Sequence, residues 1–257
     1  MIRYADITIN DRNPVKRYLQ RTRLRHSLKI FDEIEISQPL HILDFGSGNG
    51  ELCKYLSDIF SKSKIYAYEP APELRAEAQE NLKNIKNATV IDTVENISEQ
   101  FDVIFCLEVL EHLPEKELNG VLDTLKKLAK DKAIIIIGVP NEIYLPALIK
   151  GLFRMTRRYG DVDAVPSNIF KASAGIPPGH RPVSELSAGL PYIFRHMGFD
   201  YRELKMRLQH HFHIRQIYGS PLPFLPLSLN FEIYFICLKQ TEDRFADSGS
   251  YSIRFYL

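Results

Sequence analysis

The sequence predicts an α/β fold of the Rossmann-like, doubly wound type, with a mostly parallel sheet of seven strands and an antiparallel hairpin at its end. Two observations support this prediction. From residue 41 onward, short apolar runs alternate with stretches of helical periodicity, which is the pattern of successive strand–helix–strand units. The run AIIIIGVP at 133–140 contains no polar side chain, as expected of a strand that helices cover on both faces.

The predicted elements follow one another in a regular order. Strands are expected for five apolar runs, at 41–46, 64–70, 88–93, 101–108 and 132–140. Helices are expected between them at 50–60, 71–84 and 114–130, the last opened by a proline that needs no hydrogen bond there. A helix at 200–212 and an antiparallel pair of strands at 213–219 and 231–239 complete the sheet. Such sheets bind ligands at the carboxyl ends of their strands, which locates the candidate site.

A single domain is expected over residues 1–257, with three additions to the sheet. Apolar residues at helical spacing between Pro14 and Ile36 predict an N-terminal helical cap over 1–36. Residues 141–199 interrupt the alternation and contain six prolines, which indicates an inserted segment beside the acceptor site or a lid over it. The polar tail at 241–257 is expected to be loose.

Bulk composition argues against several classes of function. A net charge of +1 gives no global field that would attract nucleic acid or membranes. The three cysteines lie far apart in apolar contexts, so we expect reduced core residues and not a disulfide or zinc framework. The first ten residues lack a signal-peptide core, and the longest apolar run is too short to span a bilayer. A cytoplasmic location is therefore expected.

The sequence DFGSGNG, directly after the first predicted strand, indicates a ligand-binding loop. Its three glycines, Gly46, Gly48 and Gly50, allow sharp turns and a close approach of the backbone to a ligand. The N–H groups of the next helix then face that ligand. A dinucleotide-binding loop would read G-x-G-x-x-G, but Glu51 stands at the third glycine's place, which argues against a nicotinamide cofactor.

Acidic residues follow the next two predicted strands. Glu69 ends the second strand, where a carboxylate accepts hydrogen bonds from ribose hydroxyls, and Asp92 ends the third, where it is placed to hold an adenine amino group. The loop has no lysine or arginine to bind phosphates. A single such acid is explained equally well as a helix cap or a solvated strand end. The ordered set instead favours a nucleoside without phosphate and with a positive centre.

These motifs resemble those of class I S-adenosylmethionine (SAM)-dependent methyltransferases. ILDFGSGNG, YAYEP, VIDT and FDVIFCLEVLEHLP match the family's successive motifs in order and spacing, strongly over residues 40–140. The resemblance implies a methionine site formed by Asp44, Gly46, Ser47 and Gly48. It also implies a ribose site at Glu69 and Pro70, an adenine site near Asp92, and pocket walls at Cys106 and Leu107.

The stretch EVLEH, at 108–112, is typical of a branch with ubiquinone-biosynthesis O-methyltransferases and many small-molecule enzymes. Glu108, Glu111 and His112 have helical spacing and could share one face. In one interpretation they only form the strand–helix connection. In a second, His112 is a general base that deprotonates an attacking hydroxyl, with Glu111 beside it.

In a third interpretation, EVLEH belongs to a divalent metal site. It resembles the metal-binding E-x-x-E-H of small-RNA 2′-O-methyltransferases, which take a further histidine from after the fifth strand. His196 in RHMGFDYREL stands in such a place. Glu108, Glu111, His112 and His196 would then hold Mg²⁺ or Mn²⁺, which would gather acceptor hydroxyls and lower the pKa of one of them.

Two basic helical segments border the expected acceptor site. Residues 13–29 and 141–161 combine apolar faces with several cations, including Lys150, Arg154, Arg157 and Arg158 in the second segment. One interpretation is a pair of amphipathic helices with solvated basic faces. The other is recognition of an anionic acceptor, such as a nucleotide sugar, a lipid-linked glycan or a headgroup at a membrane surface, with peripheral membrane contact. Nucleic acid is not expected, since no stacking aromatic platform is evident.

The sequence therefore predicts a SAM-dependent methyltransferase. The match to O-methylating relatives favours O-methylation of a sugar, a glycan or a similar polyhydroxyl small molecule, assisted by a divalent metal. SAM motifs leave the acceptor atom open, so RNA, nitrogen and carbon acceptors remain alternatives. A nucleotide-dependent oxidoreductase on the same fold and a non-catalytic partner protein are the rival classes. Glu51 argues against the first, and the intact glycine loop with Glu69 argues against the second.

Overall fold

The computed structural model describes residues 14–34, 36–95, 97–186 and 189–239. The helices are α1 Pro14–Ser27, α2 Glu51–Ile59, α3 Pro72–Leu82, α4 Glu115–Leu128, α5 Tyr144–Arg158, α6 Pro166–Ser173 and α7 Tyr201–His211, with short 3₁₀ turns η2 Lys29–Glu33, η3 Leu110–His112 and η5 Leu227–Leu229. The strands are β1 His41–Phe45, β2 Lys64–Tyr68, β3 Ala88–Ile91, β4 Phe101–Leu107, β5 Ala129–Pro140, β6 Ser184–Leu186, β7 Leu190–Tyr192, β8 Phe212–Ser220 and β9 Glu232–Lys239.

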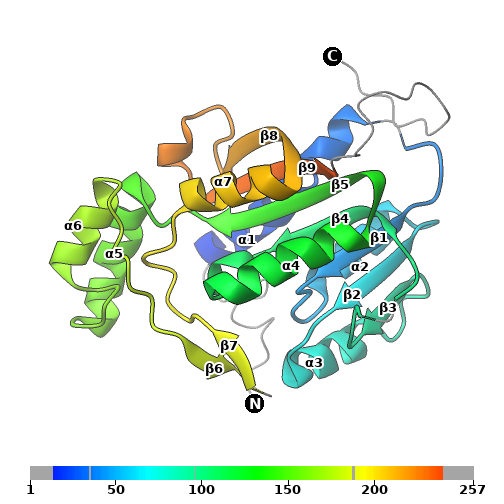
Figure 1. The fold of residues 1–257 in the computed structure, drawn as a ribbon, viewed down its shortest axis with the longest axis horizontal. Coiled ribbons are helices and arrows are strands. Elements are labelled where there is room, and N and C mark those ends of the chain that lie inside the picture. Colours follow the sequence, from blue (N-terminus) through cyan, green and yellow to red (C-terminus); the bar gives the residue numbers. More distant parts are fainter. Residues whose placement is uncertain (1–13, 35, 96, 187–188, 240–257) are drawn as a thin grey trace.

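The main sheet has seven strands in the order β3-β2-β1-β4-β5-β9-β8 (Figure 1). Strands β1 to β5 run parallel, and β9 pairs antiparallel with both β5 and β8. The predicted fold class is therefore confirmed. The structure adds that β9, the last of the described strands in sequence, lies between β5 and β8. The strand order reverses between β1 and β4, and this switch point is where open α/β sheets bind ligands.

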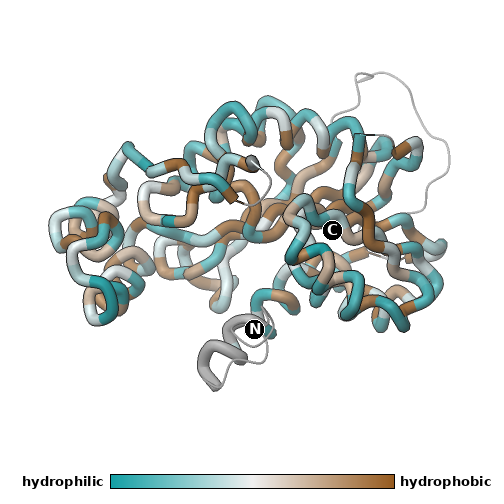
Figure 2. The backbone as a smooth tube through the Cα atoms, turned by 90° about the horizontal axis from the view of Figure 1, so that it is seen from below, coloured by the Kyte–Doolittle hydropathy of each residue, from teal (hydrophilic) through white to brown (hydrophobic). Residues whose placement is uncertain are grey.

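Two apolar cores cover the two faces of the sheet. One lies under α4 and α7, and the other lies under α2, α3 and η2. In β5 the alternate side chains Ile135 and Ile137 enter the first core, while Ile134 and Ile136 enter the second. This explains why the strand carries no polar residue over 133–140, since both of its faces exclude water. Figure 2 shows hydrophobic positions concentrated along these central strands.

The segment predicted as an insertion, 141–199, forms α5, α6 and the separate β6–β7 hairpin. Figure 1 shows α5 and α6 beyond one end of the sheet, with the hairpin reaching back below it. The N-terminal cap is helical from Pro14 to Ser27 and continues into η2. Residues 1–13 and the predicted loose tail 241–257 lie outside the described residues. None of the described helices is both long and apolar enough to cross a membrane.

The cations of α5 do not form the solvated basic face that one interpretation predicts. Lys150, Arg154 and Arg158 instead point inward onto two buried carboxylates. Arg154 forms a two-pronged contact with Glu142 at 2.8 and 3.0 Å, and Lys150 reaches the same carboxylate at 3.1 Å. Arg158 pairs with the buried Asp163 at 2.5 Å. These three cations therefore neutralise acids inside the protein, which removes three of the four side chains that the segment 141–161 offers to an anionic acceptor.

We expect Arg154→Met to lower the free energy of unfolding by about 3–5 kcal/mol at pH 7, because it leaves a buried carboxylate without its main partner. Burial opposes ionisation of Glu142, but Lys150 and Arg154 outweigh it and lower its pKa to about 2. A depressed carboxyl pKa stabilises the fold above the unfolded pKa, and that contribution is lost as pH falls towards 2. Urea unfolding should therefore show a smaller difference between wild type and variant at pH 3 than at pH 7.

The matched control for this prediction is Arg157→Met, which removes an exposed cation from the same helix. Its expected effect on the free energy of unfolding is within about 0.5 kcal/mol. Equal losses for the Arg154 and Arg157 variants, or a loss for Arg154→Met that does not change with pH, would contradict the assignment of Arg154 as the partner of Glu142.

Candidate active site

The glycine loop joins β1 to α2 at the carboxyl end of the sheet. Gly46, Gly48 and Gly50 have φ angles of 80°, 54° and 81°, in the left-handed region that other residues rarely adopt. The N–H groups of Gly46 and Ser47 both donate to the carbonyl oxygen of Tyr68, which ties the loop to the end of β2. A Cβ atom at Gly46 would lie 2.3 Å from the Val109 side chain. The loop therefore needs glycine both for its backbone shape and for its packing.

Glu69 fixes the loop from the neighbouring strand. One of its carboxylate oxygens accepts the N–H of Gly48 at 2.8 Å, and the other accepts the N–H of Ala71 at 2.9 Å. Burial raises the pKa of Glu69, and these two backbone hydrogen bonds oppose that rise. Each oxygen retains a second lone pair, so the carboxylate can still accept hydrogen bonds from two hydroxyl groups.

Asp44 supplies a buried acid at the end of β1. Its side chain accepts a weak hydrogen bond from the Cys53 thiol at 3.5 Å, and burial raises its pKa to about 7. Asp44 nevertheless borders the main cavity. A buried carboxylate with so few partners is stabilised by a bound cation, as the positive end of SAM would provide.

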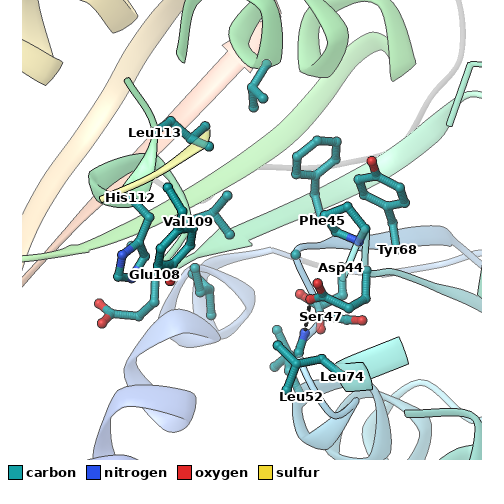
Figure 3. Close-up of a pocket in the computed structure, with 18 of the residues that line it drawn as sticks. Asp44, Phe45, Ser47, Leu52, Tyr68, Leu74, Glu108, Val109, His112 and Leu113 are labelled. Carbon is teal, nitrogen blue, oxygen red and sulfur yellow. Dashed lines mark hydrogen bonds between the residues drawn. The ribbon is translucent and has the colours of Figure 1, made fainter. Parts of the chain in front are cut away.

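A cavity of about 870 Å³ lies above this end of the sheet. Figure 3 shows Asp44, Ser47 and Tyr68 on one side of it and Glu108, Val109 and His112 on the other. The β6–β7 hairpin and the residues after it contribute a further wall, formed by Leu186, Leu190, Pro191, Tyr192, Phe194 and His196. The volume is within the range of cavities that enclose a cofactor or a drug-sized ligand.

The cavity collects most of the residues predicted to bind the cofactor. Its walls include Asp44, Gly46, Ser47, Gly48, Glu69, Pro70 and Leu107. Two predicted residues do not contribute. Asp92 is exposed beyond the end of β3, and Cys106 is fully buried in the core beneath α4, because successive side chains of β4 point to opposite faces. Tyr68, which the sequence interpretation missed, lines the cavity directly before the strand-end acid Glu69.

Glu108 forms an ion pair with the N-terminal helix α1. It has a φ angle of 56°, and its carboxylate forms a 2.8 Å ion pair with Arg23 of α1. Burial opposes ionisation of Glu108, but Arg23 outweighs it and lowers the pKa. Glu232 of β9 lies on the same arginine, with Oε1 3.7 Å from Nε, and burial raises its pKa to about 8. Arg23 and Glu232 are further wall residues that the motif analysis missed.

Glu111 lies behind the cavity wall, in η3. Its side chain is fully buried, and neither carboxylate oxygen has a hydrogen-bond partner. Burial, reinforced by the nearby Glu108, raises the pKa of Glu111 well above its ordinary value. A buried carboxyl group without hydrogen-bond partners costs free energy, so packing alone does not explain why Glu111 occupies this position.

His112 presents one ring nitrogen towards His196. Its Nδ1 lies 2.8 Å from the carbonyl oxygen of Ile193, so Nδ1 donates its proton to that oxygen and Nε2 of the neutral ring carries an acceptor lone pair. That Nε2 lies 3.3 Å from Nε2 of His196. Tyr192 stacks on the His112 ring with centroids 4.4 Å apart, which fixes its orientation. Burial lowers the pKa of both histidines, that of His196 to about 4, so both are neutral at pH 7.

Three of the four predicted metal ligands converge. One ligand atom each from Glu111, His112 and His196 lies within 4.8 Å of the others. Glu108 is not in this group, so the expectation that all four residues meet is not reproduced. The physical reason is local geometry: the chain turns into a 3₁₀ helix at Leu110–His112 after a left-handed residue, and the α-helical spacing that would align Glu108 with Glu111 is absent.

Comparison with known proteins identifies the family. A model of the methyltransferase domain matches residues 14–167, which is more than half of the chain. The chain is also 30% identical over 135 residues to the chloroplastic magnesium protoporphyrin IX methyltransferase of Arabidopsis thaliana. That alignment spans 51% of this chain and 40% of the relative.

Solved structures share the fold at low sequence identity. Magnesium protoporphyrin IX methyltransferase from Synechocystis PCC 6803, with bound S-adenosylhomocysteine (SAH), superposes with a TM-score of 0.53 at 16% identity, covering 89% of this chain and 88% of the other. A Burkholderia thailandensis 1,6-didemethyltoxoflavin-N1-methyltransferase, with its acceptor and SAH bound, gives 0.54 at 14% identity, covering 90% and 84%. The chain thus belongs to the methyltransferase-domain family, within the class I SAM-dependent methyltransferases.

Proposed function

We propose that this methyltransferase transfers the methyl group of SAM to a hydroxyl of a sugar, a glycan or a similar polyhydroxyl small molecule, with a divalent cation assisting. The observation that carries the proposal is the convergence of Glu111, His112 and His196, of which the two histidines line the cavity. A methyl sulfonium needs no covalent catalyst, so the enzyme's task is to align the acceptor and remove its proton.

The cavity has a separate end for each reactant. The glycine loop, Asp44 and Glu69 suit the methionine and ribose parts of SAM, while His112 and the hairpin border the acceptor end. Cavity polarity favours a neutral acceptor over an anionic one. Among the described residues that line the cavity, Arg23 is the only arginine or lysine, and it is flanked by the carboxylates of Glu108 and Glu232. Those carboxylates can accept hydrogen bonds from the other hydroxyls of a polyhydroxyl acceptor.

The residues present fit a divalent cation. The Nε2 atoms of the neutral His112 and His196 rings are 3.3 Å apart. This is about the distance between two nitrogen ligands of one tetrahedral metal ion. Glu111 would supply a carboxylate whose oxygens otherwise have no partner. Two histidines and one carboxylate leave coordination positions free for substrate oxygens. A bound cation would lower the pKa of a coordinated hydroxyl.

His112 alone offers a second route to the same reaction. Its Nε2 lone pair borders the cavity, and the hydrogen bond from Nδ1 to Ile193 holds the tautomer that a general base requires. A nitrogen acceptor is the competing chemistry, because the structurally similar toxoflavin enzyme is an N1-methyltransferase. The carboxylates of Glu108 and Glu232 would also attract an amine, so the acceptor atom must be decided by experiment.

The test is a transfer assay with SAM labelled on the methyl group. The full chain is incubated with separate pools of glycosides, of amines without hydroxyls and of short RNAs, each with Mn²⁺ or with excess chelator. We expect label in the glycoside pool, retained after amine-selective removal and reduced at least tenfold by chelation. Label confined to the amine or RNA pools would overturn the proposed acceptor. Calorimetry with SAH and with NAD⁺ separately tests the cofactor, and we expect binding of SAH only.

A further inference from the structure

The outer face of α5 is an exposed apolar stripe. Leu145, Ile149, Leu152 and Phe153 are exposed to 41, 44, 52 and 52%. At 100° per residue these four side chains fall within one third of the helix circumference, opposite the buried Ala147 and Gly151. We call this set the outer stripe. A contiguous apolar stripe on a folded monomer marks an interaction surface, whereas scattered single residues would not.

The stripe is not a consequence of poor packing, because α5 is firmly anchored by its other face. Lys150 and Arg154 bind Glu142 there, and Lys150 also donates to the carbonyl oxygens of Asn141 and Phe231. Most charged side chains of the helix thus face the protein, and its apolar side chains face solvent. Exposing apolar side chains to water on a rigid helix costs free energy unless another apolar medium covers them.

The surroundings of the stripe carry positive charge. Residues 144–160 contain no aspartate or glutamate. The exposed Arg157 lies beside the stripe, with its guanidinium 4.3 Å from the ring centroid of Phe153. An apolar face bordered by an exposed arginine and free of acidic residues is the pattern of helices that lie in the interface of an anionic bilayer.

A second copy of the chain fits this surface less well. The stripe exposes roughly 400 Å², taking about 200 Å² for each fully exposed side chain, whereas a stable dimer buries about 800 Å² per partner. Helix α5 is too short to span a bilayer, because its 15 residues reach only about 22 Å and the hydrocarbon core is about 30 Å thick.

We propose that α5 is an interfacial docking helix, which inserts the outer stripe into the headgroup–acyl boundary of an anionic membrane while Arg157 contacts the lipid headgroups. The proposal is independent of the acceptor assigned above. It holds whether the methylated atom is oxygen or nitrogen, and it concerns where the enzyme works.

The test is flotation of the full chain with lipid vesicles. One preparation contains phosphatidylcholine with 30 mol% phosphatidylserine, and the other contains phosphatidylcholine alone. We expect the wild type to float with the anionic vesicles and to bind them at least tenfold more tightly than the neutral ones. Leu152→Gln/Phe153→Gln should reduce binding at least tenfold, and Arg157→Gln about fivefold.

The matched control is Tyr55→Gln/Ile59→Gln, which replaces two residues of α2 that are exposed to 45 and 50%. It should leave vesicle binding unchanged, and SAH binding by all variants shows that each remains folded. Failure of the wild type to bind anionic vesicles, or an equal loss in the α2 control, would overturn the proposal. So would a concentration-dependent dimer in sedimentation equilibrium that the Leu152→Gln/Phe153→Gln variant abolishes, since the stripe would then be a contact between copies.

Discussion

Replacing Glu69 by alanine is expected to weaken SAH binding by about 100-fold or more. The carboxylate holds the N–H groups of Gly48 and Ala71 and retains the lone pairs that would accept the two ribose hydroxyls. Hydrogen bonds to a charged acceptor contribute about 1.5–3 kcal/mol each, and 1.4 kcal/mol corresponds to a tenfold change in affinity. Loss of both ribose contacts alone therefore accounts for the expected effect, and relaxation of the glycine loop adds to it.

Titration calorimetry with SAH measures this effect directly and needs no knowledge of the acceptor. Glu69→Gln should give an intermediate loss, because the amide keeps one acceptor oxygen and converts the other into a donor. The control is Glu80→Gln, which changes an exposed carboxylate further along α3. If Glu69→Ala retained wild-type affinity for SAH, the ribose would have to bind elsewhere in the cavity, and the assignment of its two ends would be wrong.

The second large effect concerns the metal cluster. We expect the wild type to bind one Mn²⁺ per chain, and Glu111→Gln and His196→Ala each to weaken that binding by at least 100-fold, because each removes one of three protein ligands. Glu108→Gln should retain most of the affinity, since Glu108 is paired with Arg23 and lies outside the cluster. This contrast distinguishes the three-ligand arrangement from the four-ligand set that the sequence motif suggested.

Calorimetry and the electron paramagnetic resonance signal of free Mn²⁺ both report this binding without any turnover. His213→Ala, at an exposed histidine of β8, is the control and should bind Mn²⁺ as the wild type does. Absence of Mn²⁺ binding by the wild type would leave His112 as a metal-free general base. Equal binding by the wild type and the Glu111 and His196 variants would show that the ion sits elsewhere.

The fold was largely predictable because its signals are local and periodic. The strand–helix alternation, the apolar run of β5 and the three glycines of the loop each follow from short-range requirements of the backbone or from burial on both faces of a sheet. For the same reason the motif residues Asp44, Gly46, Ser47, Gly48 and Glu69 could be placed at one edge of the sheet, and the structure brings them to one cavity.

The site was less predictable where its geometry depends on long-range partners. The motif at 108–112 predicts one shared helical face, but Glu108 pairs with Arg23 of α1, and His196 comes from more than eighty residues further along the chain. The family resemblance implied an adenine site near Asp92 and a pocket wall at Cys106. Only the tertiary structure shows that Asp92 is exposed and that Cys106 is buried in the core.

The sequence by itself determined the order of the sheet elements, the glycine loop and the acids that follow the strands, because these depend on residue type and spacing along the chain. Only the tertiary structure decided which charges are free. Residue types along the chain leave the cations of α5 available for a ligand, whereas the fold pairs three of them with Glu142 and Asp163 in the interior. A buried carboxylate must find a cation or lose its charge, and that requirement turned the polar face of α5 inward and its apolar stripe outward.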